Sequence, residues 1–521
     1  MQIASLSPCS AAWRVSACIA VFLLPATSLV TGFGLGAWGL LSIALLACAG
    51  RRSVAAWRQQ WADRTTHWVL LAFLVNALLH AGFLAARADA HFGALEKPVR
   101  MLLAAAATTL VLLARPPLAS LWHGAAVGAI GAAAFAVWQR WGLGWPRAGG
   151  LMNPITFGDL SACLALLCLI GAGTARAAPS SSGRQPTTDL ATSLVSSPFT
   201  SPATLLANTR ATSPGTLLTG CGAAAGVLAA LLSGSRGSWL VLVLALPVQL
   251  LIGFQDRRRL RAVLKLAALT VAVAGALWLL PQTGVRERLA LGGSDLRLYF
   301  SGQPATSLGL RLDLWRAGLR IAADHPWTGL SDDDYVQALR RMVVARQLSP
   351  AVFTLAPPPH LHNDALQALA NRGFAGLLAW GGTMAAPLWF FAARLRARPG
   401  TTASAAPDVR APALAGLLLV LSYLCFGLTE VIFWSVKGSL FYALLVFVLI
   451  GYCLAGAPAA MPAPGGTPQA AGPAPNRRRY PSRKARPSQR QAAALRQPPH
   501  TSSKPRPTPP AANPGSSGSR A

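Results

Sequence analysis

Acidic residues are scarce in this sequence, which contains 16 Asp and Glu against 46 Lys and Arg among 521 residues. Charged residues of both signs make up only 12% of the chain, whereas 53% of the residues are hydrophobic. This shortage of charge excludes an ordinary soluble domain, whose elements would alternate polar and apolar residues. Long apolar runs occur instead, and they predict an all-α polytopic membrane protein.

The sequence also lacks the cysteine spacing of a disulfide framework or a metal knuckle. Most of its eight cysteines lie inside apolar runs. An apolar run follows Arg14, but further runs follow at once, so a retained first helix is a better interpretation than a signal peptide. The net charge of +30 does not indicate nucleic acid binding, because basic residues fall mostly between apolar runs and near the C-terminus.

Counting about 20 apolar residues per span predicts twelve transmembrane helices. They lie near residues 15–31, 34–50, 67–86, 99–114, 120–138, 157–175, 215–233, 238–254, 262–280, 373–393, 411–429 and 438–456. Alternate connections are basic, as at Arg51 and Arg115, so the positive-inside rule places them and both termini in the cytoplasm. The spans themselves lack charge, which argues against an ion pathway through the bundle.

We expect residues 1–456 to form a transmembrane domain and residues 457–521 a disordered cytoplasmic tail. From Arg477 onward the tail contains eleven Lys and Arg and no acid, in a stretch rich in Pro and Ser. Two interpretations are open: the tail retains this end in the cytoplasm, or it binds anionic membrane lipids. The connection at about 281–372, between helices nine and ten, falls on the periplasmic face. Because a loop that long usually carries function, we predict that it is mostly helical and holds the active site.

Two arginines form polar signals on this periplasmic face. Arg236 lies in "SGSRGS", between helices seven and eight, where neighbouring glycines allow close approach of a ligand. The alternative is an arginine that reaches lipid phosphate. Arg311 lies on the same stripe as Trp315 in a predicted amphipathic helix that ends before Pro326. Its alternative is an ion pair with Asp313 or with the acids at 332–334.

The third signal is "PPPHLHND", in which His362 lies at or just before a helix that Asn363 or Asp364 would cap. A helix N-terminus favours a neutral imidazole, which can accept a proton, and it also attracts anions. His360 and His362 share one face of an extended segment, so a metal pair is an alternative, although no third ligand is evident. A structural histidine at the interface is another. We predict no metal here, and together the arginines and histidine suit a polyanionic lipid substrate.

The chain resembles the superfamily of O-antigen ligases and polymerases, which are glycosyltransferases of the bacterial inner membrane. The resemblance is carried by "NPITFGD" at 153–159, "SRG" at 235–237, "RLDLWRAGL" at 311–319, "HPWTGL" at 325–330 and "HNDALQALANRGFAGLL" at 362–378. It implies transfer of a glycan from undecaprenyl diphosphate to a hydroxyl acceptor at the periplasmic face, without a cofactor or a required metal. In the ligase branch, the acceptor is a sugar of lipid A-core and the glycan is O-antigen.

The resemblance also implies roles for individual residues. Arg236 and Arg311 would hold the diphosphate and stabilise its developing charge, and His362 would activate the acceptor hydroxyl. No acidic pair is available as nucleophile and acid, so direct attack with inversion is expected. The neighbouring His360 leaves open which ring is the base. A polymerase or a protein O-oligosaccharyltransferase would share these motifs, whereas a polysaccharide flippase would place polar residues along the bundle interior.

Overall fold

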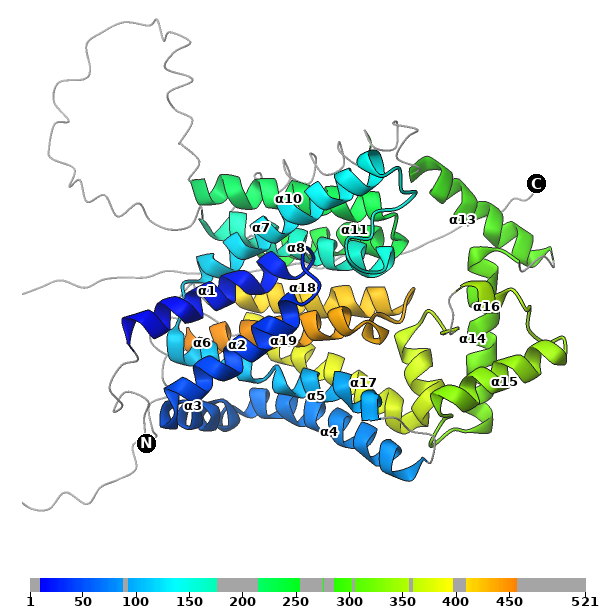
Figure 1. Cartoon of the computed structure of the whole chain (residues 1–521), viewed down its shortest axis with the longest axis horizontal. Helices are drawn as coiled ribbons and strands as arrows, with labels where there is room; N and C mark the ends of the chain where they lie inside the picture. Colours follow the sequence, from blue (N-terminus) through cyan, green and yellow to red (C-terminus); the bar gives the residue numbers. More distant parts are fainter. Residues whose placement is uncertain are drawn as a thin grey trace, which may run out of the picture. The chain divides into compact units, whose positions relative to one another are not determined.

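A computed structural model describes residues 10–87, 92–175, 214–253, 275, 285–301, 305–355, 359–396 and 409–456 of the chain. All regular structure in these ranges is helical, which confirms the predicted all-α class (Figure 1). Among these residues, eight helices are long and apolar enough to cross a membrane, or nine if one bent pair counts as a span. The protein is therefore a multi-pass membrane protein, but the count of twelve is not confirmed. The predicted span at 262–280 and the tail at 457–521 lie outside the described residues.

Eight candidate spans and three further apolar helices, one of them the first helix of the bent pair, form the helical bundle of the described part. The eight candidate spans are α4 (Arg64–Ala86), α5 with α6 (Glu96–Leu103 and Ala106–Ala114), α7 (Leu118–Val137), α8 (Pro154–Ala175), α10 (Pro214–Ser233), α17 (Asp364–Arg396), α18 (Arg410–Gly427) and α19 (Val436–Ala455). Two shorter apolar helices accompany them, α1 (Ala11–Thr27) and α11 (Arg236–Gly253). A π-helical turn at Trp138–Gly142 extends α7.

The second predicted span, at 34–50, corresponds to α2 (Gly34–Ala49). The basic connection after it is itself a helix, α3 (Arg51–Ala62), which meets α2 at an angle of 110°. Gly50 makes this bend with a φ of +53°, a left-handed value that a residue with a side chain rarely adopts. Because α3 carries basic residues on an amphipathic surface, it suits the plane of a membrane interface rather than its interior.

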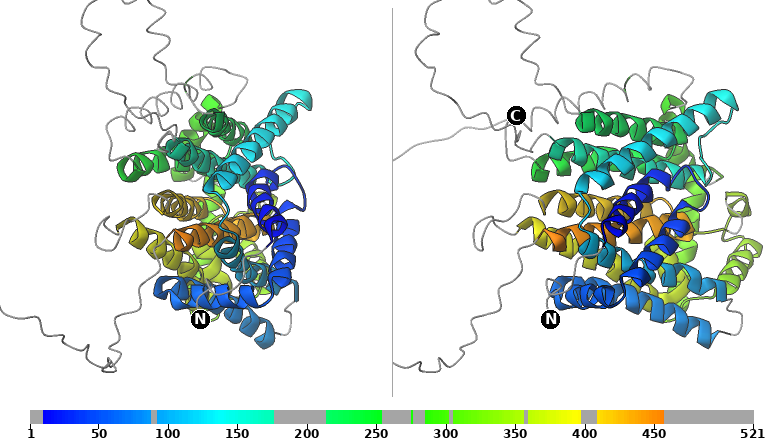
Figure 2. Two further views of the ribbon diagram at one scale, coloured as in Figure 1. Left: turned by 90° about the vertical axis from the view of Figure 1, so that its left-hand side faces the viewer. Right: turned by 60° about the vertical axis from the view of Figure 1, so that its left-hand side comes forward.

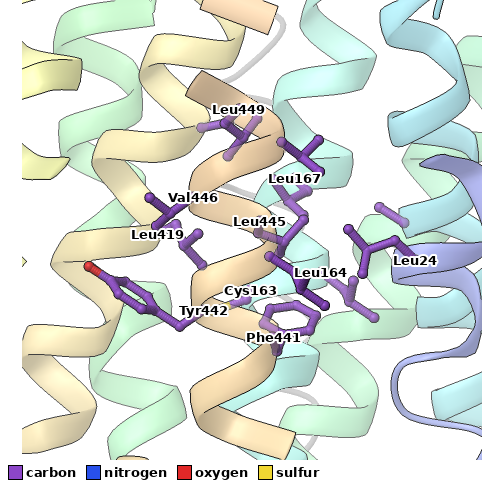
Figure 3. Close-up of a cluster of buried hydrophobic side chains, with 14 of the residues drawn as sticks. Leu24, Cys163, Leu164, Leu167, Leu419, Phe441, Tyr442, Leu445, Val446 and Leu449 are labelled. Carbon is purple, nitrogen blue, oxygen red and sulfur yellow. The ribbon is translucent and has the colours of Figure 1, made fainter. Parts of the chain in front are cut away.

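Helix α19 lies in the middle of the bundle, and nearly all of its side chains are buried (Figure 2). Figure 3 shows Phe441 and Leu445 of α19 among Leu164 of α8, Leu419 of α18 and Leu24 of α1. Such packing matters because hydrophobicity alone does not drive helices together in lipid. Close contacts between backbones supply part of the association energy, so helix interfaces in membranes favour small residues.

The connection between the bundle helices α11 and α17 is helical in its described parts. It contains α13 (Val285–Phe300), α14 (Ser307–Asp324), α15 (Asp332–Val344) and the single turn α16 (Val352–Leu355), which gather at one end of the bundle (Figure 1). These elements have a small hydrophobic core of their own, which includes Leu310, Leu314, Tyr335, Leu339 and Leu361. The predicted amphipathic helix is α14, and the hydroxyl of Thr306 caps it by accepting a bond from Gly309 N at 3.1 Å.

Two of the sequence motifs dock this connection onto α17. The amide of Leu330 donates to Ala370 O at 2.9 Å, and the amide of Phe374 donates to Pro326 O at 2.7 Å. Gly373 kinks α17 at this place, with a φ of +60°. The segments "HPWTGL" and "NRGFAG" therefore pack backbone to backbone, and this contact fixes the connection relative to the bundle.

Replacing Gly373 with alanine is expected to destabilise the protein. A Cβ at this position would lie 2.3 Å from the carbonyl carbon of Trp327, and the positive φ adds strain of about 1–3 kcal/mol. Gly381→Ala in the same helix is the matched control, because nothing lies within 4 Å of its Cβ position. Thermal unfolding in detergent measures both. Equal melting temperatures would contradict the proposed tight packing.

Candidate functional site

Leu361 anchors the segment that carries the two histidines. It is fully buried in the loop core. Its carbonyl accepts a bond from Trp315 Nε1 at 2.8 Å, and its amide donates to Gln367 Oε1 at 2.8 Å. His360 and His362 flank Leu361, and their rings lie together, with centroids 4.1 Å apart.

His362 has a left-handed backbone, with a φ of +50°. Such a conformation is uncommon for a residue other than glycine, and it persists only where the surroundings enforce it. The helix that begins at Asp364 supplies one constraint, since Asn363 Oδ1 accepts a bond from Leu366 N at 3.0 Å. Asn363 is thus the cap of this helix. The sequence had left the choice between Asn363 and Asp364 open. Asp364 Oδ1 instead accepts a bond from Phe433 N at 3.4 Å, which ties α17 to the connection after α18.

Glu430, in the connection between α18 and α19, binds both histidines. Its Oε2 lies 3.0 Å from His362 Nδ1 and its Oε1 lies 3.3 Å from His360 Nε2. Sequence reasoning missed Glu430, which is 68 residues from His362. The available signal was a single acid at the end of an apolar run, in a chain that has few acids.

The carboxylate of Glu430 determines which nitrogen of His362 is basic. Burial alone would raise the pKa of Glu430, but the hydrogen bond from His362 and the charges of both histidines and Arg311 bring it below its usual value. An ionised carboxylate only accepts hydrogen bonds, so the proton of His362 lies on Nδ1. Its Nε2 is buried and has no hydrogen-bond partner among the described residues. This nitrogen is therefore available to accept a proton.

Three arginines from separate parts of the chain line a cavity of about 100 Å³ next to this pair. Arg236 is the first residue of α11, Arg311 lies on α14, and Arg147 lies between α7 and α8. Thr429 also lines the cavity and directly precedes Glu430 in the chain. The cavity thus combines positive charge with a neighbouring basic imidazole, an arrangement suited to a phosphate ester.

The motif "NPITFGD" positions the turn that carries Arg236. Asp159 Oδ1 accepts a bond from Ser235 Oγ at 2.9 Å. Gly158 allows α8 to approach this turn, because a Cβ there would lie 2.1 Å from Ser233 Oγ. Arg147 Nε donates to Ser233 O at 2.9 Å and so holds the same turn from the other side. Arg147 was not predicted from the sequence.

Comparison with known proteins agrees with this geometry. The sequence profile of a protein family described as O-antigen ligase matches residues 221–381, which include both predicted arginines and both histidines. Over this segment the chain is therefore similar to the O-antigen ligase family. An uncharacterized protein of Haemophilus influenzae is 23% identical over 226 residues, which are 43% of this chain and 54% of that protein. The chain therefore spans about half the length of the curated relative it matches.

Glu430 and Arg147 lie outside the segment that matches the O-antigen ligase profile. Within that segment, the alternative ion pair of Arg311 with Asp313 is not found among the described residues. Asp313 lies 3.9 Å from Arg316 instead and accepts a bond from Tyr299 at 3.3 Å. Arg311 Nε is buried without a hydrogen-bond partner in the described part of the chain. Its guanidinium is therefore available to a ligand in the cavity.

Glu430 gives the histidine pair the third neighbour that a metal site would require. The ligand atoms of His360, His362 and Glu430 all lie within 4.8 Å of one another. The charge nearby argues against a metal ion, because Arg311 is close enough to lower the pKa of Glu430 and would repel a divalent cation. Both carboxylate oxygens are already hydrogen-bonded, Oε2 to His362 Nδ1 at 3.0 Å and Oε1 to Val431 N at 3.1 Å. We therefore interpret the cluster as an oriented base rather than a metal centre.

His360 should make the fold sensitive to acid. Burial lowers the pKa of His360 from about 6.5 to about 4. Between these values the unfolded chain takes up a proton that the folded protein refuses, so stability falls as the pH falls from 6.5 to 4, by up to about 3 kcal/mol. His360→Gln should flatten this dependence. Melting temperatures of both proteins across this pH range test it, and parallel curves would contradict it.

Proposed function

We propose that the protein is an O-antigen ligase at the periplasmic face of the bacterial inner membrane. In this proposal it transfers O-antigen from undecaprenyl diphosphate to a sugar hydroxyl of lipid A-core, and both chain termini lie in the cytoplasm. The observation that carries the proposal is a cavity lined by three arginines and by Thr429, whose neighbour Glu430 binds His362 and leaves Nε2 of that histidine without a partner among the described residues. A lipid diphosphate offers the oxygens that such a cavity would bind.

The proposed reaction is a single displacement. Nε2 of His362 takes the proton of the acceptor hydroxyl while the hydroxyl oxygen attacks the anomeric carbon of the donor glycan. The bond from this carbon to the diphosphate breaks, and its electron pair remains on the diphosphate oxygen. Arg236 and Arg311 stabilise that charge, and Glu430 stabilises the imidazolium that forms. Attack from the face opposite the leaving group inverts the anomeric configuration.

We expect the transfer to be independent of metal ions. The guanidinium groups supply the positive charge that a divalent cation would otherwise supply to a diphosphate. Purified protein assayed with lipid-linked O-antigen and lipid A-core should therefore retain its rate, within about twofold, after treatment with EDTA. A rate that collapses with EDTA and returns with zinc would reverse this view and favour the cluster of His360, His362 and Glu430 as a metal centre.

A gene deletion tests the choice of acceptor. Loss of the ligase should leave lipopolysaccharide that ends at the core, while polymerised O-antigen accumulates on its lipid carrier. An O-antigen polymerase would instead leave single repeats on the core, and a protein O-oligosaccharyltransferase would leave the lipopolysaccharide ladder intact. Transport of a lipid-linked glycan by proteoliposomes without an acceptor would favour a flippase. Complementation by the wild-type gene, but not by His362→Ala, connects the result to the site.

A further inference from the structure

A second cavity, of about 200 Å³, borders the histidine cluster. Val431 lines it, whereas Thr429 lines the arginine cavity, so Glu430 stands between the two along the chain. Trp434 lines the second cavity and its ring lies 5.9 Å from His360. Residues next to Glu430 in the chain therefore line both cavities, which suits a transferase with two large substrates.

Three buried polar atoms of the second cavity lack hydrogen-bond partners in the described part of the chain. They are Arg372 Nε, Trp380 Nε1 and Asp364 Oδ2, and all three residues belong to its lining. A buried polar group without a partner costs about 1–3 kcal/mol, so native proteins rarely leave one unsatisfied. Three such groups around one cavity indicate a polar ligand.

The remaining lining indicates the chemical class of this ligand. Side-chain amides from Asn76, Gln367 and Asn371 can exchange hydrogen bonds with hydroxyl groups. Trp380 and Trp434 offer flat apolar surfaces with a polar edge, which suit the C–H face of a sugar ring. This mixture of amides and indoles is too polar for a lipid chain.

Charged residues of both signs line the cavity. Lys97 is one of them, and its Nζ lies over the Trp434 ring at 5.4 Å from the centroid. Arg372 and Asp332 line the same cavity. Because cations and a carboxylate stand together, the lining suits the donor and acceptor hydroxyl groups of a sugar.

The amides are also connected to the histidine segment. Gln367 Oε1 accepts a bond from Leu361 N at 2.8 Å, and Gln367 Nε2 donates to Asn371 Oδ1 at 2.7 Å. Asn371 in turn donates to Asp332. One hydrogen-bonded chain thus fixes the wall of the second cavity and the backbone that precedes His362.

We propose that this cavity binds the saccharide of the acceptor, with its polar groups at Lys97 and Arg372 and its ring against Trp434. The acceptor role rests on the proposed function, because it requires that His362 be the base. Binding of the saccharide itself does not depend on the proposed function. The arginine cavity would then serve the lipid diphosphate, and the two substrates would meet at His362.

The test uses full-length protein in lipid nanodiscs and core oligosaccharide released from lipopolysaccharide as the probe. Lys97→Gln and Trp434→Leu should each weaken probe binding about tenfold and raise the KM for lipid A-core about as much, with the donor KM unchanged. Arg100→Gln, on the same helix as Lys97 but paired with Glu96 at 2.7 Å, is the first control. Trp138→Leu, an exposed indole on the extension of α7, is the second.

Each outcome decides between alternatives. Weaker binding after the probe is dephosphorylated assigns phosphate as a recognised group, and unchanged binding supports recognition of the sugar ring and its hydroxyl groups. Probe binding that both variants weaken, without any transfer to lipid A-core, would support the saccharide site and overturn the proposed function. Wild-type probe affinity in both variants, at unchanged melting temperatures, would overturn the inference. So would variants that weaken binding of the lipid diphosphate instead.

Discussion

Replacing His362 with glutamine is expected to lower the rate of glycan transfer by about 10²–10⁴-fold, the usual contribution of a general base. Glutamine preserves hydrogen bonding but cannot accept the proton of the acceptor hydroxyl. Nε2 of His362 is buried without a partner among the described residues, and the bond from Nδ1 to Glu430 Oε2 at 3.0 Å orients the ring. Because the loss concerns the chemical step, it should appear in kcat, with little change in the KM of either substrate.

His360→Gln is the matched control for this change. Both histidines contact the same carboxylate and each has a buried nitrogen without a partner among the described residues, but His362 has the shorter contact to Glu430, at 3.0 Å against 3.3 Å. Substitution of His360 should lower the rate by less than about tenfold, since only the orientation of Glu430 is altered. The measurement is transfer from lipid-linked O-antigen to lipid A-core by purified variants of equal melting temperature. A larger loss for His360 than for His362 would exchange their roles, and equal activity of both with wild type would refute the site.

The sequence predicted local features of the site well. The cap and the helix after His362 follow from "HND" and the apolar residues behind it, and α17 begins at Asp364 as this pattern indicates. Arg236 and Arg311 are 75 residues apart in number, yet both line one cavity. Counting basic connections placed them on one face of the membrane, which was enough to suggest a common ligand.

The features that the sequence did not predict depend on distant contacts. Glu430 has no local pattern, and its importance arises only because the chain returns between α18 and α19 to the histidine segment. Arg147 lies in an irregular connection, where the hydropathy pattern does not indicate the direction in which a side chain points. The bend at Gly50 is similar, because an apolar run predicts a span but not the angle at which the next helix leaves it.

The resemblance to O-antigen ligases assigned roles to residues, and the structure supplies physical reasons for them. A histidine near an arginine is an ordinary combination, but a histidine with one nitrogen bound to a buried carboxylate and the other free is a prepared base. The left-handed backbone of His362 adds to this argument. Strain of this kind is retained where a precise orientation has a function.

Substitution of Arg311 by alanine is expected to lower kcat for glycan transfer by about 10²–10³-fold, because it removes a charge that stabilises the leaving diphosphate. Arg316→Ala is the matched control. It lies on the exposed face of the same helix, with 69% of its side chain accessible. Arg311→Lys should recover only part of the rate, since an ammonium group retains charge but loses the forked pair of hydrogen bonds.

The kinetic pattern separates this role from a structural one. Two donors are compared, the natural lipid diphosphate and a donor with a better leaving group. If Arg311 contacts the leaving group, Arg311→Ala should slow transfer from the second donor less than transfer from the natural one. A merely structural arginine predicts the same loss for both donors and a lower melting temperature. Arg311 is half-buried beside Glu430, so the melting temperature of each variant must accompany its rate. Equal losses for Arg311→Ala and Arg316→Ala would show that general charge, rather than the cavity, supports the transfer.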